Sequence, residues 1–404
     1  MGLSRDKTQR FTAIILVCVL MSPMTRGEKI YDPGATDDQI KIGTVTSLSG
    51  LGNAYAAVGR AEAAYFQMVN DQGGIRGRKI EFISRDSGFE PGKSLALARE
   101  LVEKDNVLLI FSSLGTEANL AMRSYMNEQK IPQLFVQSAS SVFNDPAHFP
   151  WTMGLFVSYR QEGLVYAKYI RENKPDGRIG ILYADNDAGR EYLAGIHEGL
   201  GDKASAMIVR EIPYETSDET LNSQIAALKN SGADVFLNLS IGTFATRAIR
   251  TAYDMDWHPL QFIPNASLSV AAFLEPAGLR KAAGIITNAR SKGWLSVTAQ
   301  DDPDVRDFLQ WMKNYNPNAS LRDQNNCAGY ERAEALVEVL KKCGDDLTRA
   351  NVMKQAASLD MTIGMLRPGI RITTSATDYQ PIKQLFLMRF DGSEWVPFGS
   401  VIGE

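Results

Sequence analysis

The chain has few of the residues and motifs that catalysis and metal binding usually need. It contains only three histidines and three cysteines in 404 residues. No histidine has a neighbouring Cys, His or paired acid at ligand spacing, so the sequence predicts no metal site. No Gly-x-Ser-x-Gly motif occurs, and the nearest match, at 238–242, lacks the first glycine. We therefore expect a protein that is not an enzyme and has no catalytic residues and no cofactor.

The cysteines are also too far apart to predict a disulfide. Cys327 and Cys343 bracket a helical pattern at 328–342, and a helix of sixteen residues separates them by about 24 Å. A disulfide requires Cα atoms within about 7 Å of each other. We therefore expect two unpaired thiols at the ends of one helix.

Basic clusters and a complete phosphate-binding loop are missing as well. The formal net charge is -4, without a Lys/Arg cluster, which argues against nucleic acid as a partner. Gly92-Lys93-Ser94 resembles the end of a phosphate loop, but Ser87 stands where such a loop needs its first glycine. We expect a helix start with a solvated lysine there.

The N-terminus has the pattern of a secretory signal peptide over residues 1–27. Arg5, Lys7 and Arg10 precede an apolar run at 11–21, which is too short for a membrane span of about 20 residues. Residues 15–17 lack the small residue that lipidation at Cys18 requires. Cleavage removes four basic groups and one acid, so the charge falls from -4 to -7. We expect the mature chain to be exported and soluble.

The rest of the chain alternates β-like runs with amphipathic helices, which is typical of a parallel α/β sheet. Strands are predicted at 40–46, 79–84, 107–111 and 133–136, and the pattern restarts at 178–183 with strands near 206–212, 233–237 and 261–263. Helix-rich sequence follows at 305–359, then a hairpin turning at Asp391-Gly392. The two halves end a strand alike, with Ser-x-Gly-Thr at 113–116 and at 240–243. We therefore predict two similar lobes that form a ligand cleft at the carboxyl ends of their strands.

Small polar residues follow two neighbouring strands of the first half. After the strand at 107–111, the segment 112–116 (SSLGT) leads into a helix, and 137–141 (QSASS) follows the next strand. Helix N-termini carry unpaired N–H groups and attract anions, and hydroxyl groups add further donors. A simple N-cap at Thr116 is the alternative reading. The shared pocket would contain five hydroxyl groups, those of Ser113, Thr116, Ser138, Ser140 and Ser141. We expect it to hold a carboxylate.

From about residue 40 to 401 the chain resembles periplasmic solute-binding proteins of the branched-chain amino acid (Leu/Ile/Val-binding) type, which serve ABC importers. The resemblance is carried by the segments 42–50 (IGTVTSLSG), 61–66 (AEAAYF), 70–78 (NDQGGIRGR), 132–135 (PQLF) and 167–170 (AKYI).

The resemblance implies a type I periplasmic-binding-protein fold, with two open parallel-sheet lobes joined by a three-strand hinge. We expect lobe 1 to comprise residues 38–157 and 290–368, and lobe 2 to comprise 158–289 and 369–404. It also implies that Ser113, Thr116, Ala139 and Ser141 hold the ligand carboxylate, with Ser138 beside them. A tyrosine near the ligand corresponds to Tyr55.

Several positions depart from the pattern of amino-acid binders. Ala188 and Ile241 stand where that pattern has aromatic residues, and Asn265 stands where it has the acid that binds the ligand's ammonium group. A buried ammonium without an acidic partner is costly. We therefore expect a carboxylate with an apolar or aromatic body, and a branched-chain amino acid as the alternative.

The resemblance also implies the partners of the chain. They are a small carboxylate ligand and an ABC permease in the inner membrane, with the binding protein itself a monomer. The alternative class is a sensor that presents the same closed form to a membrane receptor. A permease gene beside this one would favour transport.

Overall fold

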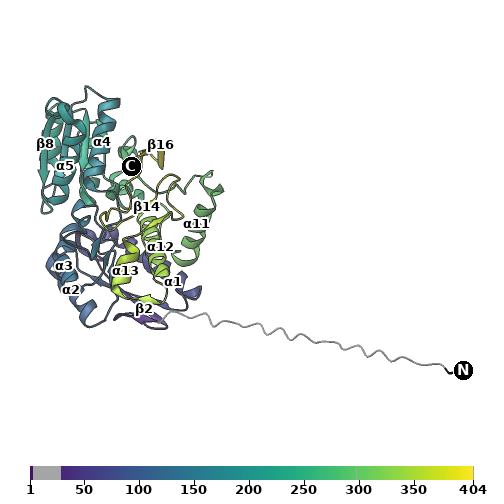
Figure 1. Ribbon diagram of the computed structural model, residues 1–404. Helices are drawn as coiled ribbons and strands as arrows, with labels where there is room; N and C mark the ends of the chain where they lie inside the picture. Colours follow the sequence, from purple (N-terminus) through teal and green to yellow (C-terminus); the bar gives the residue numbers. More distant parts are fainter. Residues whose placement is uncertain (3–28, 297, 404) are drawn as a thin grey trace.

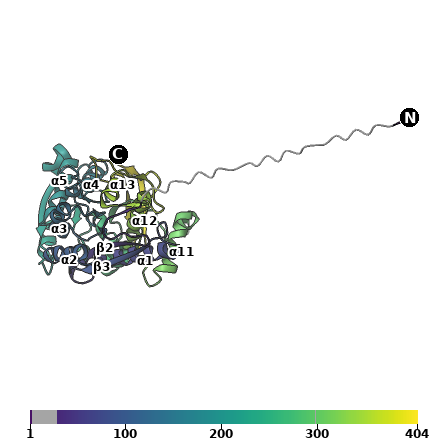
Figure 2. The ribbon, with the colours of Figure 1, turned by 60° about the horizontal axis from the view of Figure 1, so that its bottom comes forward.

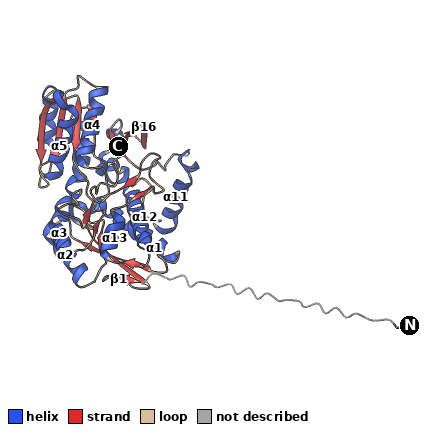
Figure 3. Cartoon of the chain, viewed as in Figure 1, coloured by secondary structure: helices blue, strands red, loops and turns tan. Residues whose placement is uncertain are grey.

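The computed structural model describes residues 1–2, 29–296 and 298–403. Cys18 and all but the first two residues of the predicted signal peptide (1–27) lie outside these residues. Figure 1 shows two joined bodies, an upper one around α4, α5 and β8 and a lower one around α1, α2, α3, α12 and α13. We call the second of these lobe 1 and the first lobe 2. Figure 3 shows that each contains strands covered by helices.

Lobe 1 is built on a five-stranded parallel sheet in the order β3-β2-β4-β5-β6. Its strands are β2 (Gln39–Thr46), β3 (Lys79–Asp86), β4 (Leu109–Phe111), β5 (Gln133–Leu134) and β6 (Thr152–Met153). Its helices are α1 (Ala56–Asp71), α2 (Pro91–Glu103), α3 (Thr116–Glu128), α11 (Pro303–Tyr315), α12 (Asn325–Cys343) and α13 (Arg349–Ala356). All three residues of β4 are buried, as expected for the centre of a parallel sheet covered on both faces.

Lobe 2 is built on a seven-stranded sheet in the order β16-β15-β11-β10-β9-β7-β8. Its parallel strands are β7 (Ile179–Ala184), β8 (Ile208–Tyr214), β9 (Val235–Leu239), β10 (Leu260–Phe262) and β11 (Ile286–Ala289). The predicted C-terminal hairpin, β15 (Leu385–Phe390) and β16 (Trp395–Ile402), adds two antiparallel strands. The main helices are α4 (Tyr159–Asn173), α5 (Asp187–Leu200), α7 (Asn222–Asn230) and α8 (Thr243–Asp254).

Besides short 3₁₀ helices, the described chain has several other short elements. They are β1 (Ile30–Tyr31), β12 (Asp346–Leu347), β13 (Asp360–Met361), β14 (Ile372–Thr373), α6 (Ala204–Met207), a π-helix (Val270–Leu274), α9 (Glu275–Ala277) and α10 (Leu279–Ala282). The predicted helix between the two cysteines is α12, and both thiols are buried and free.

The segment after β13 contacts lobe 1 beyond residue 368, where we expected lobe 1 to end. β14 pairs with β13, and Tyr379 donates its backbone N–H to Asn144 and its hydroxyl to the carbonyl of Pro150. The chain joins the seven-stranded sheet only at β15. These contacts lie beyond residue 369, where the sequence suggested the last crossing between the lobes. The lobe boundaries stay a prediction.

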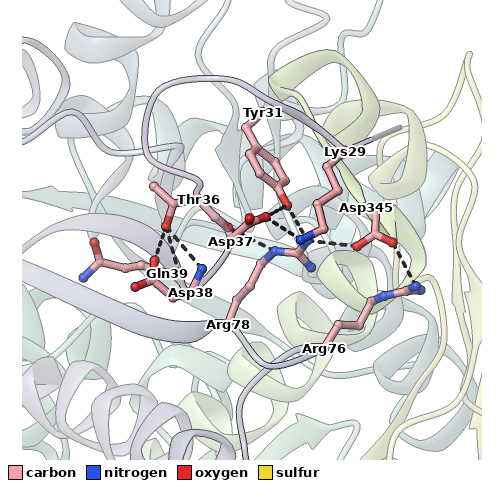
Figure 4. A network of polar contacts seen from close by, with 9 residues as sticks. All are labelled: Lys29, Tyr31, Thr36, Asp37, Asp38, Gln39, Arg76, Arg78 and Asp345. Atoms are coloured by element: carbon pink, nitrogen blue, oxygen red, sulfur yellow. Dashed lines mark hydrogen bonds and ion pairs between the residues drawn. The ribbon is translucent and has the colours of Figure 1, made fainter. Parts of the chain in front are cut away.

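The segment 70–78 (NDQGGIRGR) has a structural role at the base of lobe 1. The amide of Asn70 exchanges two hydrogen bonds with the backbone of Ile80, which joins the end of α1 to β3. The Arg78 guanidinium is buried and donates to the carbonyl of Thr36, to the hydroxyl of Tyr31 and to Asp345 (Figure 4). Hydrogen bonding to Arg78 holds the pKa of Asp345 below its usual value. This network fastens the N-terminal segment beside the C-terminal end of α12.

In the view turned by 60°, β2 and β3 lie between α1 and α2, and α12 lies beside them (Figure 2). α12 lies close against α1, since a Cβ at Gly329 would lie about 2.7 Å from the Cβ of Ala61. The two parts of lobe 1, far apart in the sequence, thus form one body.

Candidate ligand-binding site

A cavity of about 260 Å³ lies between the two lobes. Its walls come from the carboxyl ends of β4, β5, β7, β9 and β10, from the starts of α3 and α4, and from α12. Six of the eight predicted site residues line it: Tyr55, Thr116, Ser138, Ala139, Ala188 and Asn265. Ser113 and Ser141 are not among the lining residues.

Thr116 and Ser138 form the polar part of the lobe 1 wall. Their hydroxyl groups share a hydrogen bond of 2.8 Å, and the Ser138 hydroxyl also accepts from the backbone N–H of Ser140 at 3.1 Å. Thr116 is the first residue of α3 and follows Gly115, whose φ of 99° favours glycine. The first N–H groups of a helix lack carbonyl partners within the helix. This wall can therefore present neutral donors to an anion.

Ser113 holds the loop and does not face the cavity. Its side chain is 1% exposed, and its hydroxyl donates to Oδ1 of Asn119 at 2.5 Å. The amide of Asn119 in turn donates to the carbonyls of Ser113 and Gly115 at 2.7 Å each. Ser112, with φ of 52°, turns the backbone just before this point. Ser113 thus positions the start of α3 indirectly.

Ser141 lies at the rim, where the two lobes touch. It is exposed, and its backbone N–H donates to Oε1 of Glu191 on α5 at 2.6 Å. Burial raises the pKa of Glu191. The contact joins lobe 1 to lobe 2 at the edge of the cleft.

Tyr55 also spans the cleft. Its hydroxyl donates to the carbonyl of Ala266 at 3.1 Å, and its ring packs against Phe273 with centroids 5.6 Å apart. Both partners belong to lobe 2. Burial raises the pKa of Tyr55, so the phenol stays protonated and donates.

A second set of contacts between the lobes involves the π-helix and the loop before α12. Ser269 donates to Asp323 at 2.7 Å, and the N–H of Val270 donates to the side chain of Gln324 at 2.8 Å. The N–H of Ala271 donates to the carbonyl of Arg322 at 2.9 Å. These bonds hold the lobes in contact.

Asn265 is fully engaged with the protein. Its side-chain amide donates to the carbonyl of Asn288 at 2.7 Å and accepts from Arg290 at 3.4 Å. Its backbone N–H donates to Oε1 of Glu162 at 2.7 Å. Asn265 therefore lines the cavity as a neutral, satisfied group.

Glu162 is a buried cavity residue that the sequence reasoning missed. It lies in the first turn of α4, and its carboxylate accepts from Tyr166 at 2.9 Å and from Tyr192 at 3.0 Å, besides Asn265. Burial raises the pKa of Glu162. The sequence signal was faint: a glutamate on a helix that otherwise reads as amphipathic. Both of its oxygens already have donors, so it offers little to an ammonium group.

Tyr159 is a second residue that the sequence did not indicate. It begins α4, its N–H donates to the carbonyl of Ala139 at 2.8 Å, and its ring lies 4.9 Å from that of Tyr192. Burial raises the pKa of its phenol. Hydrogen bonds with the Ala139 N–H and the hydroxyls of Ser138 and Thr116 lower this pKa, but by less. A lobe 2 hydroxyl therefore meets the neutral donors of lobe 1.

Aromatic side chains from both lobes make up much of the remaining wall. They include Phe89, Phe156, Tyr214, Phe244, Trp294 and Trp395. The indole N–H of Trp294 donates to the carbonyl of Leu321, and that of Trp395 to Leu268, each at 2.8 Å. The aromatic residues missing at Ala188 and Ile241 are thus offset by rings from other positions. The cavity suits an apolar or aromatic body.

The described part of the chain contains neither a metal-binding cluster nor a helix that could span a membrane. No group of three or more His, Cys, Asp or Glu side chains there is arranged to hold a metal ion. All three histidines are exposed and lie beside an acid: Asp145, Glu211 or Asp256. Within those residues no helix is long and apolar enough to cross a membrane.

Comparison with known proteins identifies relatives over nearly the full length. The chain is 21% identical over 364 residues to Leu/Ile/Val-binding protein homolog 3 of Brucella melitensis, covering 86% of this chain and 92% of that protein. A branched-chain amino acid ABC transporter protein from Thermus thermophilus, solved with bound valine, superposes with a TM-score of 0.79 at 16% identity. That match covers 91% of this chain and 97% of the other.

A solute-binding protein from R. palustris, solved in complex with benzoate, superposes with a TM-score of 0.75 at 18% identity, covering 91% and 98% of the two chains. These two structures share the two-lobed fold with this chain. The family model for periplasmic binding proteins matches residues 39–394. The chain belongs to the periplasmic binding protein family.

Proposed function

We propose that the chain is the extracytoplasmic solute-binding component of an ABC importer and captures a small carboxylate-bearing solute between its lobes. The observation that carries the proposal is the pairing of neutral donors with an aromatic wall in one cavity. Thr116, Ser138 and the start of α3 supply the donors for the carboxylate. The family, and the amino-acid and benzoate complexes named for its structural neighbours, support this class of ligand.

The ligand's body is apolar or aromatic and lacks an ammonium group. Among the described residues that line the cavity, Glu162 is the buried carboxylate, and its oxygens already accept three hydrogen bonds. Asn265 is neutral, and its Oδ1 accepts a hydrogen bond from Arg290. Glu117 and Glu394 also line the cavity but are partly exposed, so an ammonium group buried beside Asn265 would lack a free, buried acidic partner, which costs several kcal/mol.

Binding follows population shift. The solute stabilises the form in which the lobes touch, and the permease recognises that form. The contacts of Tyr55 and Ser269 across the cleft are part of the closed state. Trp294 and Trp395 line the cavity, so their fluorescence reports occupancy and closure.

The experiment is a thermal-shift screen of the mature chain with matched compounds. Each set contains an acid, its amide and the corresponding α-amino acid, for example 4-methylpentanoate, 4-methylpentanamide and leucine. A ligand at 100 times its Kd stabilises the protein by about 2.7 kcal/mol. We expect acids to raise Tm and amides to have no effect. Stabilisation by amides or amines, without any by acids, would contradict the proposal.

A further inference from the structure

A buried arginine lines the same cavity without a hydrogen-bond acceptor for two of its nitrogens. Arg332, in the first half of α12, is 2% exposed. Its guanidinium lies 4.0 Å from the ring centroid of Phe156, which also lines the cavity. Within residues 29–296 and 298–403, its Nε and Nη1 have no acceptor. Burial lowers the pKa of Arg332 to about 9, so it keeps its charge at neutral pH and is a buried cation that needs a partner.

The neighbouring arginine does have its partner. Arg290 also lies 4.0 Å from the Phe156 ring centroid, but its guanidinium forms an ion pair of 2.8 Å with Glu331. Glu331 additionally accepts from the hydroxyl of Ser291 at 2.5 Å. The carboxylate next to Arg332 on α12 is thus committed to the segment that follows β11.

The other nearby acid is Glu62 on α1. Its side chain is 1% exposed, and its Oε1 has no hydrogen-bond partner among the described residues. Burial raises the pKa of Glu62 and favours the neutral carboxylic acid. The positive charge of Arg332 acts in the opposite direction, but its effect is smaller. A protonated Glu62 leaves the charge of Arg332 unbalanced. An anion entering the cavity would balance that charge, and its oxygens would accept from the free guanidinium nitrogens.

Arg332 is separate from the neutral donors proposed for the first carboxylate. Those donors follow β4 and β5, whereas Arg332 comes from α12 and reaches the cavity beside Phe156. We propose that Arg332 forms a second anion-binding subsite in the cleft, and that the solute is a dicarboxylate with an apolar or aromatic spacer. This inference rests on the proposed function and narrows its ligand class.

The experiment compares monoacids with diacids of the same spacer by isothermal titration calorimetry. The probes are benzoate with benzene-1,4-dicarboxylate, and hexanoate with hexanedioate. We expect the diacid of at least one pair to bind the wild-type chain at least tenfold more tightly than its monoacid. In Arg332→Met that advantage disappears, so the diacid's Kd rises at least tenfold, or about 1.4 kcal/mol. Arg332→Lys keeps the charge and retains part of the preference.

Controls separate the outcomes. Arg123→Met removes another arginine stacked on a ring, that of Phe149 at 3.6 Å, away from the cavity lining, and leaves both affinities unchanged. If Arg332→Met binds the monoacid, the variant is folded. If the variant does not fold, the comparison is made with Arg332→Lys. Monoacid binding without any diacid preference in the wild type, or a preference of undiminished size in Arg332→Met and in Arg332→Lys, overturns this inference and leaves the proposed function intact. Failure of every acid, with binding of amides or amines, overturns both.

Discussion

Replacing Thr116 by valine tests the neutral-donor wall with little change in shape. The hydroxyl shares a 2.8 Å hydrogen bond with Ser138 and lines the cavity. A hydrogen bond to a charged group contributes about 1.5–3 kcal/mol. Since each 1.4 kcal/mol is tenfold, we predict that Thr116→Val raises the Kd of the acid found by screening by about 10- to 100-fold. Valine keeps the branched shape, so the fold is retained.

Calorimetric titration measures the change in Kd, and circular dichroism shows whether the variant is folded. Ser113→Ala is the matched control, because the Ser113 hydroxyl donates to Asn119 inside the loop and not into the cavity. It lowers Tm and leaves Kd within about threefold of the wild type. The reasoning is refuted if Thr116→Val leaves Kd unchanged, or if Ser113→Ala weakens binding as strongly as Thr116→Val.

Three further predictions concern closure, packing and pH. Tyr55→Phe removes the hydroxyl donated across the cleft and raises Kd about 2- to 10-fold in a titration, while Tm of the free protein changes little. Gly163→Ala places a Cβ 2.6 Å from the Tyr192 carbonyl and destabilises the α4–α5 packing by about 1–3 kcal/mol in urea unfolding, whereas Gly92→Ala, with open space, does not. Burial raises the pKa of Glu334 to about 7, so its protonated form favours the folded state at low pH. This stabilisation is complete below the unfolded pKa near 4.5 and is lost as pH rises through 7, so Glu334→Gln removes up to about 3 kcal/mol of the decline in unfolding free energy between pH 5 and pH 9. A decline of the same size in the variant would contradict this assignment.

Most of the architecture was predictable because local sequence patterns coincide with the tertiary structure. The apolar run before Ser112 is a buried strand, and Pro91 begins α2 as expected. The periodic face of α1 is buried at Ala61, Tyr65 and Val69. β5 is shorter than predicted, because Phe135 has φ of 54° and leaves the sheet. Repetition of such units implied two lobes and a cleft.

The site was only partly predictable because side-chain directions depend on backbone turns and on distant partners. Ser112 has a left-handed backbone conformation, with φ of 52°. The hydroxyl of the next residue, Ser113, therefore donates to Asn119 and does not face the cavity. No local pattern reveals that Glu162 reaches Tyr192 and Asn265. Arg332 interrupts the apolar face of α12, yet only the fold brings it beside Phe156.

The most direct measurement is a crystal structure of the mature chain with the acid selected by the thermal-shift screen. We predict that a carboxylate lies between the lobes, within hydrogen-bonding distance of the hydroxyls of Thr116 and Ser138, with its apolar body against the aromatic wall. An occupant bound outside the cleft, or one held through an ammonium group at Glu162, would contradict the proposed site.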